Sequence, residues 1–130
     1  MNGHKTYLHI SAGSTLSFEE ACTILDEINE CFEKISAEDK QDFYKEMLEK
    51  AFKYSQIRCQ WELMSGEERA LNDSYRTSAH NGFITSINVI SRLAGQEGID
   101  ASWLGKLGDN RKRIGDFACF LSYINGICNR

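Results

Sequence analysis

The sequence contains no proline among its 130 residues, and it has no long hydrophobic run. Proline interrupts helices and is confined to turns and sheet edges, so a chain without it can be mostly helical, with short connections of glycine and serine. A membrane-spanning helix needs at least ~18 apolar residues, and no segment approaches that length. The first residues also lack the basic and apolar stretches of a secretory signal. We therefore expect a soluble, cytoplasmic protein.

Familiar catalytic and cofactor motifs are missing as well. There is no phosphate-binding glycine loop, no zinc-ligand pattern and no Gly-x-Ser-x-Gly elbow. The chain has five cysteines, but no pair has C-x-x-C spacing. Cys22 and Cys31 are nine residues apart, as are Cys119 and Cys128. On one helix that separation places the thiols about 13 Å apart along the axis, too far for a disulfide. We expect reduced thiols, no metal and no cofactor.

What is present is typical of one ordinary globular domain. Hydrophobic residues make up 42% of the chain and charged residues 26%, which excludes a disordered protein. The formal net charge of −4 argues against general nucleic-acid binding, which needs an extended basic face. Arg58 is the only arginine in residues 1–65, whereas residues 66–130 contain six. Arginine fixes the geometry of hydrogen bonds, so we expect any site to lie in the second half.

Helix start signals divide the chain. Ser17-Phe-Glu-Glu20 and Ser65-Gly-Glu-Glu68 are capping boxes, and Ser36-Ala-Glu-Asp39 is a further start signal. Apolar residues at helical spacing follow each of them. The predicted helices run over residues 18–35, over 40–52 with a possible continuation through Ile57 and Trp61 to Met64, over 67–95, over 100–107 with Asp100 as the cap, and over 110–130.

The fold class that we predict is all-α: a single bundle of four long helices plus one short helix over residues 15–130, with a flexible N-terminal arm at residues 1–14. The third long helix should bury Leu71 and Tyr75 with its other apolar residues, and the last should bury Ile114 and Ile124. The opposite side of the last helix carries Gly115, Ser122 and Gly126. Small residues let another helix approach closely, either within the bundle or across a homodimer.

Arg76 stands out because helical geometry places it on the apolar side of its helix, in the direction of Ala79, Phe83 and Ile90. A guanidinium facing a core must be paired, or it destabilises the fold by several kcal/mol, roughly. Spacing of three and four residues lets Asp73 and His80 reach it. Asp116, flanked by apolar residues, can accept from Arg76 or His80 across the bundle.

These side chains form the candidate site. Its predicted members are Asp73, Arg76, His80, Asn81, Asn88, Trp103, Arg111, Arg113 and Asp116. Three interpretations stay open: a buried ion-pair network that fixes helix packing, a polar pocket for a ligand or partner, and a catalytic site. The basic run 111–113 lies in the first turn of the last helix, where the helix dipole also favours anions.

The segment Arg76-Thr-Ser-Ala-His80 resembles the Arg…His motif of HEPN-type ribonucleases. In that family, small all-α proteins act on RNA at a dimer interface, and four to six residues usually separate the pair; here there are three. The resemblance implies that His80 acts as base or acid on a ribose 2′-hydroxyl and that Arg76 stabilises the phosphate charge.

A second resemblance covers most of the second half. Arg76…His80-Asn81-Gly-Phe-Ile84 and Leu107-Gly-Asp-Asn-Arg111…Ile114-Gly-Asp-Phe-Ala-Cys119 are similar to segments of a family of small, uncharacterised bacterial proteins. This resemblance implies that the two segments form one unit and implies no activity.

The sequence therefore favours a non-catalytic helical module that binds another protein, with no catalytic residues. The alternative is a metal-independent HEPN-like ribonuclease that uses Arg76 and His80.

Overall fold

The computed structural model describes residues 16–108 and 110–125, so the predicted arm at residues 1–14, Gly126 and Cys128 lie outside the described residues. The described residues form helices and no strand, which confirms the all-α bundle of four long helices and one short helix. The helices are α2 (Phe18–Lys34), α3 (Lys40–Trp61), α4 (Gly66–Gln96), α5 (Trp103–Leu107) and α6 (Arg111–Ile124).

Both predicted capping boxes are confirmed. The Ser17 hydroxyl accepts from the backbone N–H of Glu20 at 3.0 Å, and the Glu20 carboxylate accepts in return from the N–H of Ser17. Ser65 and Glu68 form the same reciprocal pair at the start of α4, with distances of 3.1 and 3.0 Å. These bonds satisfy backbone donors that have no partner inside a helix.

Two other start signals work differently from the prediction. Asp39 is the N-cap of α3 but makes no side-chain capping bond, and Ser36 instead donates its N–H to Glu97 at 2.8 Å. This bond ties the α2–α3 connection to the end of α4. The N-cap of α5 is Ser102, not Asp100, whose carboxylate accepts from the N–H and the hydroxyl of Ser102.

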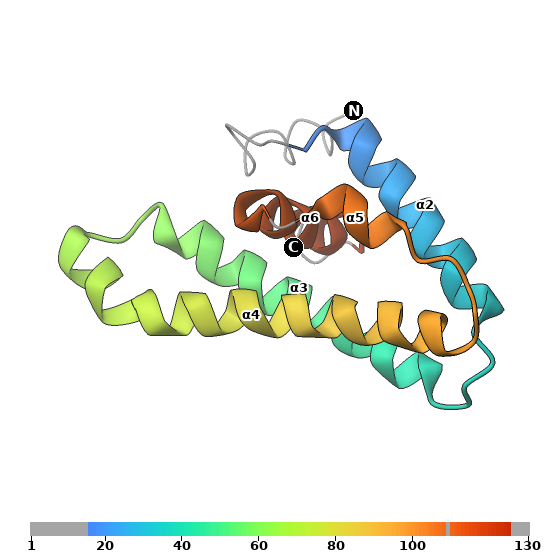
Figure 1. The fold of residues 1–130 in the computed structure, drawn as a ribbon. Coiled ribbons are helices and arrows are strands. Elements are labelled where there is room, and N and C mark those ends of the chain that lie inside the picture. Colours follow the sequence, from blue (N-terminus) through green and yellow to red (C-terminus); the bar gives the residue numbers. More distant parts are fainter. Residues whose placement is uncertain (1–15, 109, 126–130) are drawn as a thin grey trace.

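The longest helices, α3 and α4, form an antiparallel hairpin that is the base of the fold (Figure 1). Helix α6 packs mainly on α3, while α2 contacts α4, α5 and α6. One end of the hairpin, where α3 ends and α4 begins, projects beyond α6 (Figure 1).

Leu71 and Tyr75 belong to this projecting end, which corrects their predicted burial. Leu71 is 82% exposed and Tyr75 48% exposed. Their apolar spacing continues the stripe of α4, but none of the described helices extends far enough to cover it (Figure 1).

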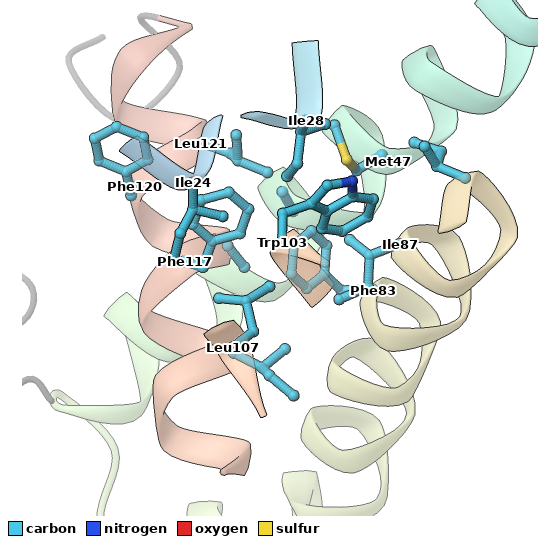
Figure 2. Close-up of a cluster of buried hydrophobic side chains, with 14 of the residues drawn as sticks. Ile24, Ile28, Met47, Phe83, Ile87, Trp103, Leu107, Phe117, Phe120 and Leu121 are labelled. Carbon is cyan, nitrogen blue, oxygen red and sulfur yellow. The ribbon is translucent and has the colours of Figure 1, made fainter. Parts of the chain in front are cut away.

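Trp103 lies in the hydrophobic core, so its assignment to a polar network is wrong. Its indole is 1% exposed and packs with Ile28, Met47, Phe83 and Ile87 (Figure 2). The indole N–H has no hydrogen-bond partner among the described residues. Burial of this aromatic surface brings α2, α3 and α4 together around α5. None of the described helices is long and apolar enough to cross a membrane.

The middle of helix α6 is buried on all sides, because every residue from Ile114 to Ser122 is buried. Its small residues face α3: Gly115 lies against the Tyr54 ring, and the hydroxyls of Ser122 and Ser55 are 3.0 Å apart. Of the proposed dimer face, Gly115 and Ser122 are therefore used within the fold and are not available to a second copy. Ile124, predicted in the core, is 45% exposed.

Candidate functional site

A cavity of about 320 Å³ opens between α3, α4 and the first turn of α6, and we call it the basic pocket. Four of the side chains that line it are cationic at neutral pH. The lining residues are Tyr54, Arg58, Arg76, Thr77, His80, Arg111 and Lys112.

On the α3 wall of the basic pocket, Arg58 is the one lining cation that has a carboxylate partner among the described residues. Arg58 forms an ion pair with Asp116 of α6, with 2.6 Å between Nη2 and Oδ1, and the Asp116 side chain is fully buried. Nη1 of Arg58 also donates to Sγ of Cys119 at 3.6 Å. A buried carboxylate without a counter-charge is very costly, so this pair holds Arg58 firmly in place.

This pairing corrects the prediction that Asp116 accepts from Arg76 or His80. The predicted site residues did not include Arg58, Tyr54 or the neighbouring Trp61. A signal for them was present, because spacings of four and three residues place Tyr54, Arg58 and Trp61 on one face of α3. Burial raises the pKa of the Tyr54 phenol, which stays neutral.

Arg76 is the central cation of the α4 wall. Its guanidinium carbon lies 4.7 Å from the centroid of the Trp61 ring, a cation–π contact. Its Nε is buried and has no hydrogen-bond partner among the described residues. The predicted partner Asp73 is exposed and lines an adjoining hollow on α4 with Ser74, Thr77, Ser78 and Asn81, of which Thr77 also lines the basic pocket. Arg76 makes no ion pair with Asp73 or any other described carboxylate.

His80 lines the same cavity but is only 5% exposed. Its Nε2 lies 2.8 Å from the backbone carbonyl of Arg111, so we assign the proton to Nε2. Nδ1 is then unprotonated, and it is buried without a partner among the described residues. Burial lowers the pKa of His80, as do the charges of Arg111, Arg58 and Arg76, while the bond to the Arg111 carbonyl partly opposes this shift. His80 is therefore neutral at pH 7 and positions the start of α6.

The first turn of α6 completes the basic pocket with Arg111 and Lys112. Both residues are exposed, and Nη2 of Arg111 donates to Oδ1 of Asn81 at 3.2 Å. The N-terminal end of a helix carries partial positive charge, which adds to these cations.

Arg113 is turned away from the basic pocket. Its Nε donates to the carbonyl of Lys106 at 2.8 Å, and its Nη2 pairs with Glu20 of α2 at 2.9 Å. The bond from Arg113 and the capping bond to Ser17 lower the pKa of the Glu20 carboxyl. Arg113 thus connects α6 with α5 and α2.

The predicted site residues therefore do not all lie in one place. The structure brings Arg76, His80 and Arg111 to one cavity, with Asn81 beside them. Asp116 lies behind the wall, paired with Arg58. Asn88 lines a different hollow between α4, α5 and α6, which shares only Arg111 with the basic pocket. The remaining predicted residues lie outside the basic pocket: Asp73, Trp103 and Arg113.

The charge of the basic pocket is unbalanced. Asp116 offsets Arg58, but Arg76, Arg111 and Lys112 have no carboxylate partner among the described residues. This concentration of positive charge occurs in a chain whose formal net charge is −4. A partly enclosed cavity lined by one sign of charge attracts ions of the opposite sign.

In the part of the chain that the structure describes, no group of three or more His, Cys, Asp or Glu side chains is placed to hold a metal ion. Comparisons with protein-family models, with curated proteins and with solved structures gave no match to this chain.

Proposed function

We propose that this protein is a non-catalytic helical module that binds a partner protein by accepting one of its acidic groups in the basic pocket. The observation that carries the proposal is the absence of a carboxylate partner for Arg76, Arg111 and Lys112 within residues 16–108 and 110–125. Three cations held close together repel one another, and an acidic group from outside relieves that repulsion.

The state of His80 supports binding over catalysis. A general base must reach the proton that it removes. In His80, Nε2 is engaged with the Arg111 carbonyl and Nδ1 is buried, so neither nitrogen is presented to a substrate in this conformation.

The acidic character of the chain favours a protein partner over nucleic acid, because binding to nucleic acid depends on cations spread along an extended face. The compartment that we propose is the cytoplasm. None of the four cysteines within the described residues is in a disulfide, as expected in a reducing compartment.

Site-specific photo-crosslinking tests this proposal. Thr77 is exposed and lines the basic pocket, so a photoreactive amino acid at this position should crosslink to a defined partner in cells of the native host. Thr85 is exposed on the same helix but does not line the basic pocket, and it provides the control position.

The product at Thr77 should disappear when Arg76→Gln is added and should be absent at Thr85, and mass spectrometry should place the crosslink beside an acidic residue. The same products at both positions, or products that are insensitive to Arg76→Gln, would contradict the proposal.

The second candidate function is the HEPN-like ribonuclease, favoured by the fact that Arg76 and His80 line one cavity. The test is RNA cleavage by the purified protein and by His80→Ala. Cleavage that disappears in His80→Ala, together with a dimer in sedimentation, would replace the non-catalytic proposal. Our proposal expects no cleavage by either protein.

A further inference from the structure

We infer that the acidic group accepted by the basic pocket is a phosphate monoester on a phosphorylated side chain, in preference to a carboxylate. The inference rests on the proposed function and names the chemistry of its ligand. Four properties of the cavity support it: charge, donor geometry, rigidity and size.

Charge is the first reason. Arg76, Arg111 and Lys112 present three positive charges that no described carboxylate offsets. A carboxylate brings one negative charge, whereas a phosphate monoester carries about −1.5 to −2 at pH 7. The dianion therefore comes closer to balancing the cavity.

The positions of the donors are the second reason. Arg76 extends from α4 and Arg111 from the first turn of α6, so their guanidinium groups reach the cavity from separate helices. The oxygens of a phosphate point in several directions and can accept from both, whereas a planar carboxylate has only two oxygens.

The third reason is that the walls are already fixed. Trp61 supports the Arg76 guanidinium, and Asp116 anchors Arg58. Asn81 accepts from the Arg111 side chain, while His80 holds the Arg111 backbone. Side chains held in place lose little conformational freedom when a ligand binds, which increases affinity.

Size is the last reason. The cavity of about 320 Å³ lies at the lower end of the range for ligand pockets, roughly 300–1,000 Å³. It is larger than one carboxylate requires and can accept a phosphate with part of the side chain that carries it.

The experiment compares the peptides acetyl-Ala-X-Ala-amide, where X is phosphoserine, glutamate or serine. Each is titrated into ¹⁵N-labelled protein at pH 7, and the Nε–H cross-peak of Arg76 is followed by NMR. The phosphoserine peptide should shift this cross-peak and bind at least about tenfold more tightly than the glutamate peptide. The serine peptide should not bind.

Matched variants locate the site. Binding to the variants is followed through the backbone amide cross-peaks of residues 76–80, and Arg76→Gln should weaken binding of the phosphoserine peptide by about tenfold or more. Arg92→Gln, at an exposed arginine of the same helix outside the basic pocket, should leave binding unchanged. Lys112→Gln alters an exposed side chain of the basic pocket and provides the same test if Arg76→Gln fails to fold.

Two further titrations, with inorganic phosphate and with a uridine hexanucleotide, separate the sources of a phosphoryl group. Tighter binding of free phosphate or of RNA than of the phosphoserine peptide would overturn the inference. Equal binding of the glutamate and phosphoserine peptides would also overturn it, but would leave the proposed function standing. If no peptide or anion shifts the Arg76 cross-peak, both the inference and the proposed function fail.

Discussion

At the residue scale, Arg58 and Arg76 of the basic pocket differ in what their removal would leave unpaired. Arg58 neutralises the fully buried Asp116, whereas Arg76 rests on Trp61 and pairs with no described carboxylate. The sequence suggested that Arg76 was the arginine whose loss would strand a partner. The structure assigns that role to Arg58.

We therefore predict that Arg58→Ala destabilises the fold by about 3–5 kcal/mol, because it leaves an unpaired buried carboxylate. Arg76→Ala should cost only about 0.5–2 kcal/mol, the range of a cation–π contact. Urea unfolding of both variants measures the difference. The double variant Arg58→Met with Asp116→Leu should recover much of the loss, since it removes both charges together.

His80 gives a prediction about pH. Its pKa in the folded state is lowered below the ordinary 6.5, mainly by burial, so the unfolded chain binds more protons than the folded one just below that pH. The free energy of unfolding should therefore fall as the pH drops through about 6.5, with a slope from this group of at most about 1.4 kcal/mol per pH unit.

The measurement is urea unfolding between pH 7.5 and 5.5, with His80→Gln as the control. The variant should show a flatter dependence, because Gln can donate to the Arg111 carbonyl but does not titrate. The carboxyl groups of Glu20, Glu68 and Glu97, whose pKa values are lowered from 4.5, destabilise the fold on protonation only at more acidic pH. Parallel curves for the two proteins would mean that His80 is not the group responsible.

At the element scale, the contact of α6 with α3 depends on Gly115. A Cβ atom at this position would lie 2.8 Å from Oη and 3.0 Å from Cε2 of Tyr54, which is itself buried. The helices can approach this closely only because the glycine has no side chain. Tyr54 is also part of the basic pocket, so this helix contact shapes the site.

Gly115→Ala should destabilise the protein by about 1–3 kcal/mol, the range found for overpacking, despite the better helix propensity of alanine. Gly95→Ala in α4 is the matched control, because a Cβ there meets nothing within 4 Å. It should be neutral or stabilising by up to about 1 kcal/mol. Equal effects in urea unfolding would show that helix propensity, not the Tyr54 contact, decides the outcome.

The helices themselves could be predicted from the sequence because their signals are local. The capping boxes at Ser17 and Ser65 and the apolar spacing place α2 and α4 within one or two residues. The helical wheel also gives the direction of Arg76 toward the inner side of α4. It cannot distinguish a filled core from an open cavity in that direction, since this depends on where α6 begins. The pairing of Arg58 with Asp116, far apart in the sequence, depends on the same helix placement.

At the scale of the whole molecule, the burial of α4 changes along its length. A helix of 31 residues is about 46 Å long, and its middle and last turns pack in the core, where Phe83, Ile90 and Ala94 have no exposed surface. Its first turns belong to the projecting end of the hairpin, where Leu71 is 82% exposed (Figure 1). The basic pocket lies between these two regions, at Arg76 and His80.

Local stability should follow this gradient, because segments with few buried apolar contacts open without global unfolding. We predict that amide hydrogens of residues 70–75 exchange at least about tenfold faster than those of residues 83–94, relative to their unfolded rates. Hydrogen exchange followed by NMR measures this directly. Phosphoserine peptide bound at Arg76 should slow exchange in residues 76–80 and leave residues 88–94 unchanged. Uniform protection along α4 would instead mean that the projecting end is covered in solution, and Leu71→Ser would then restore fast exchange there.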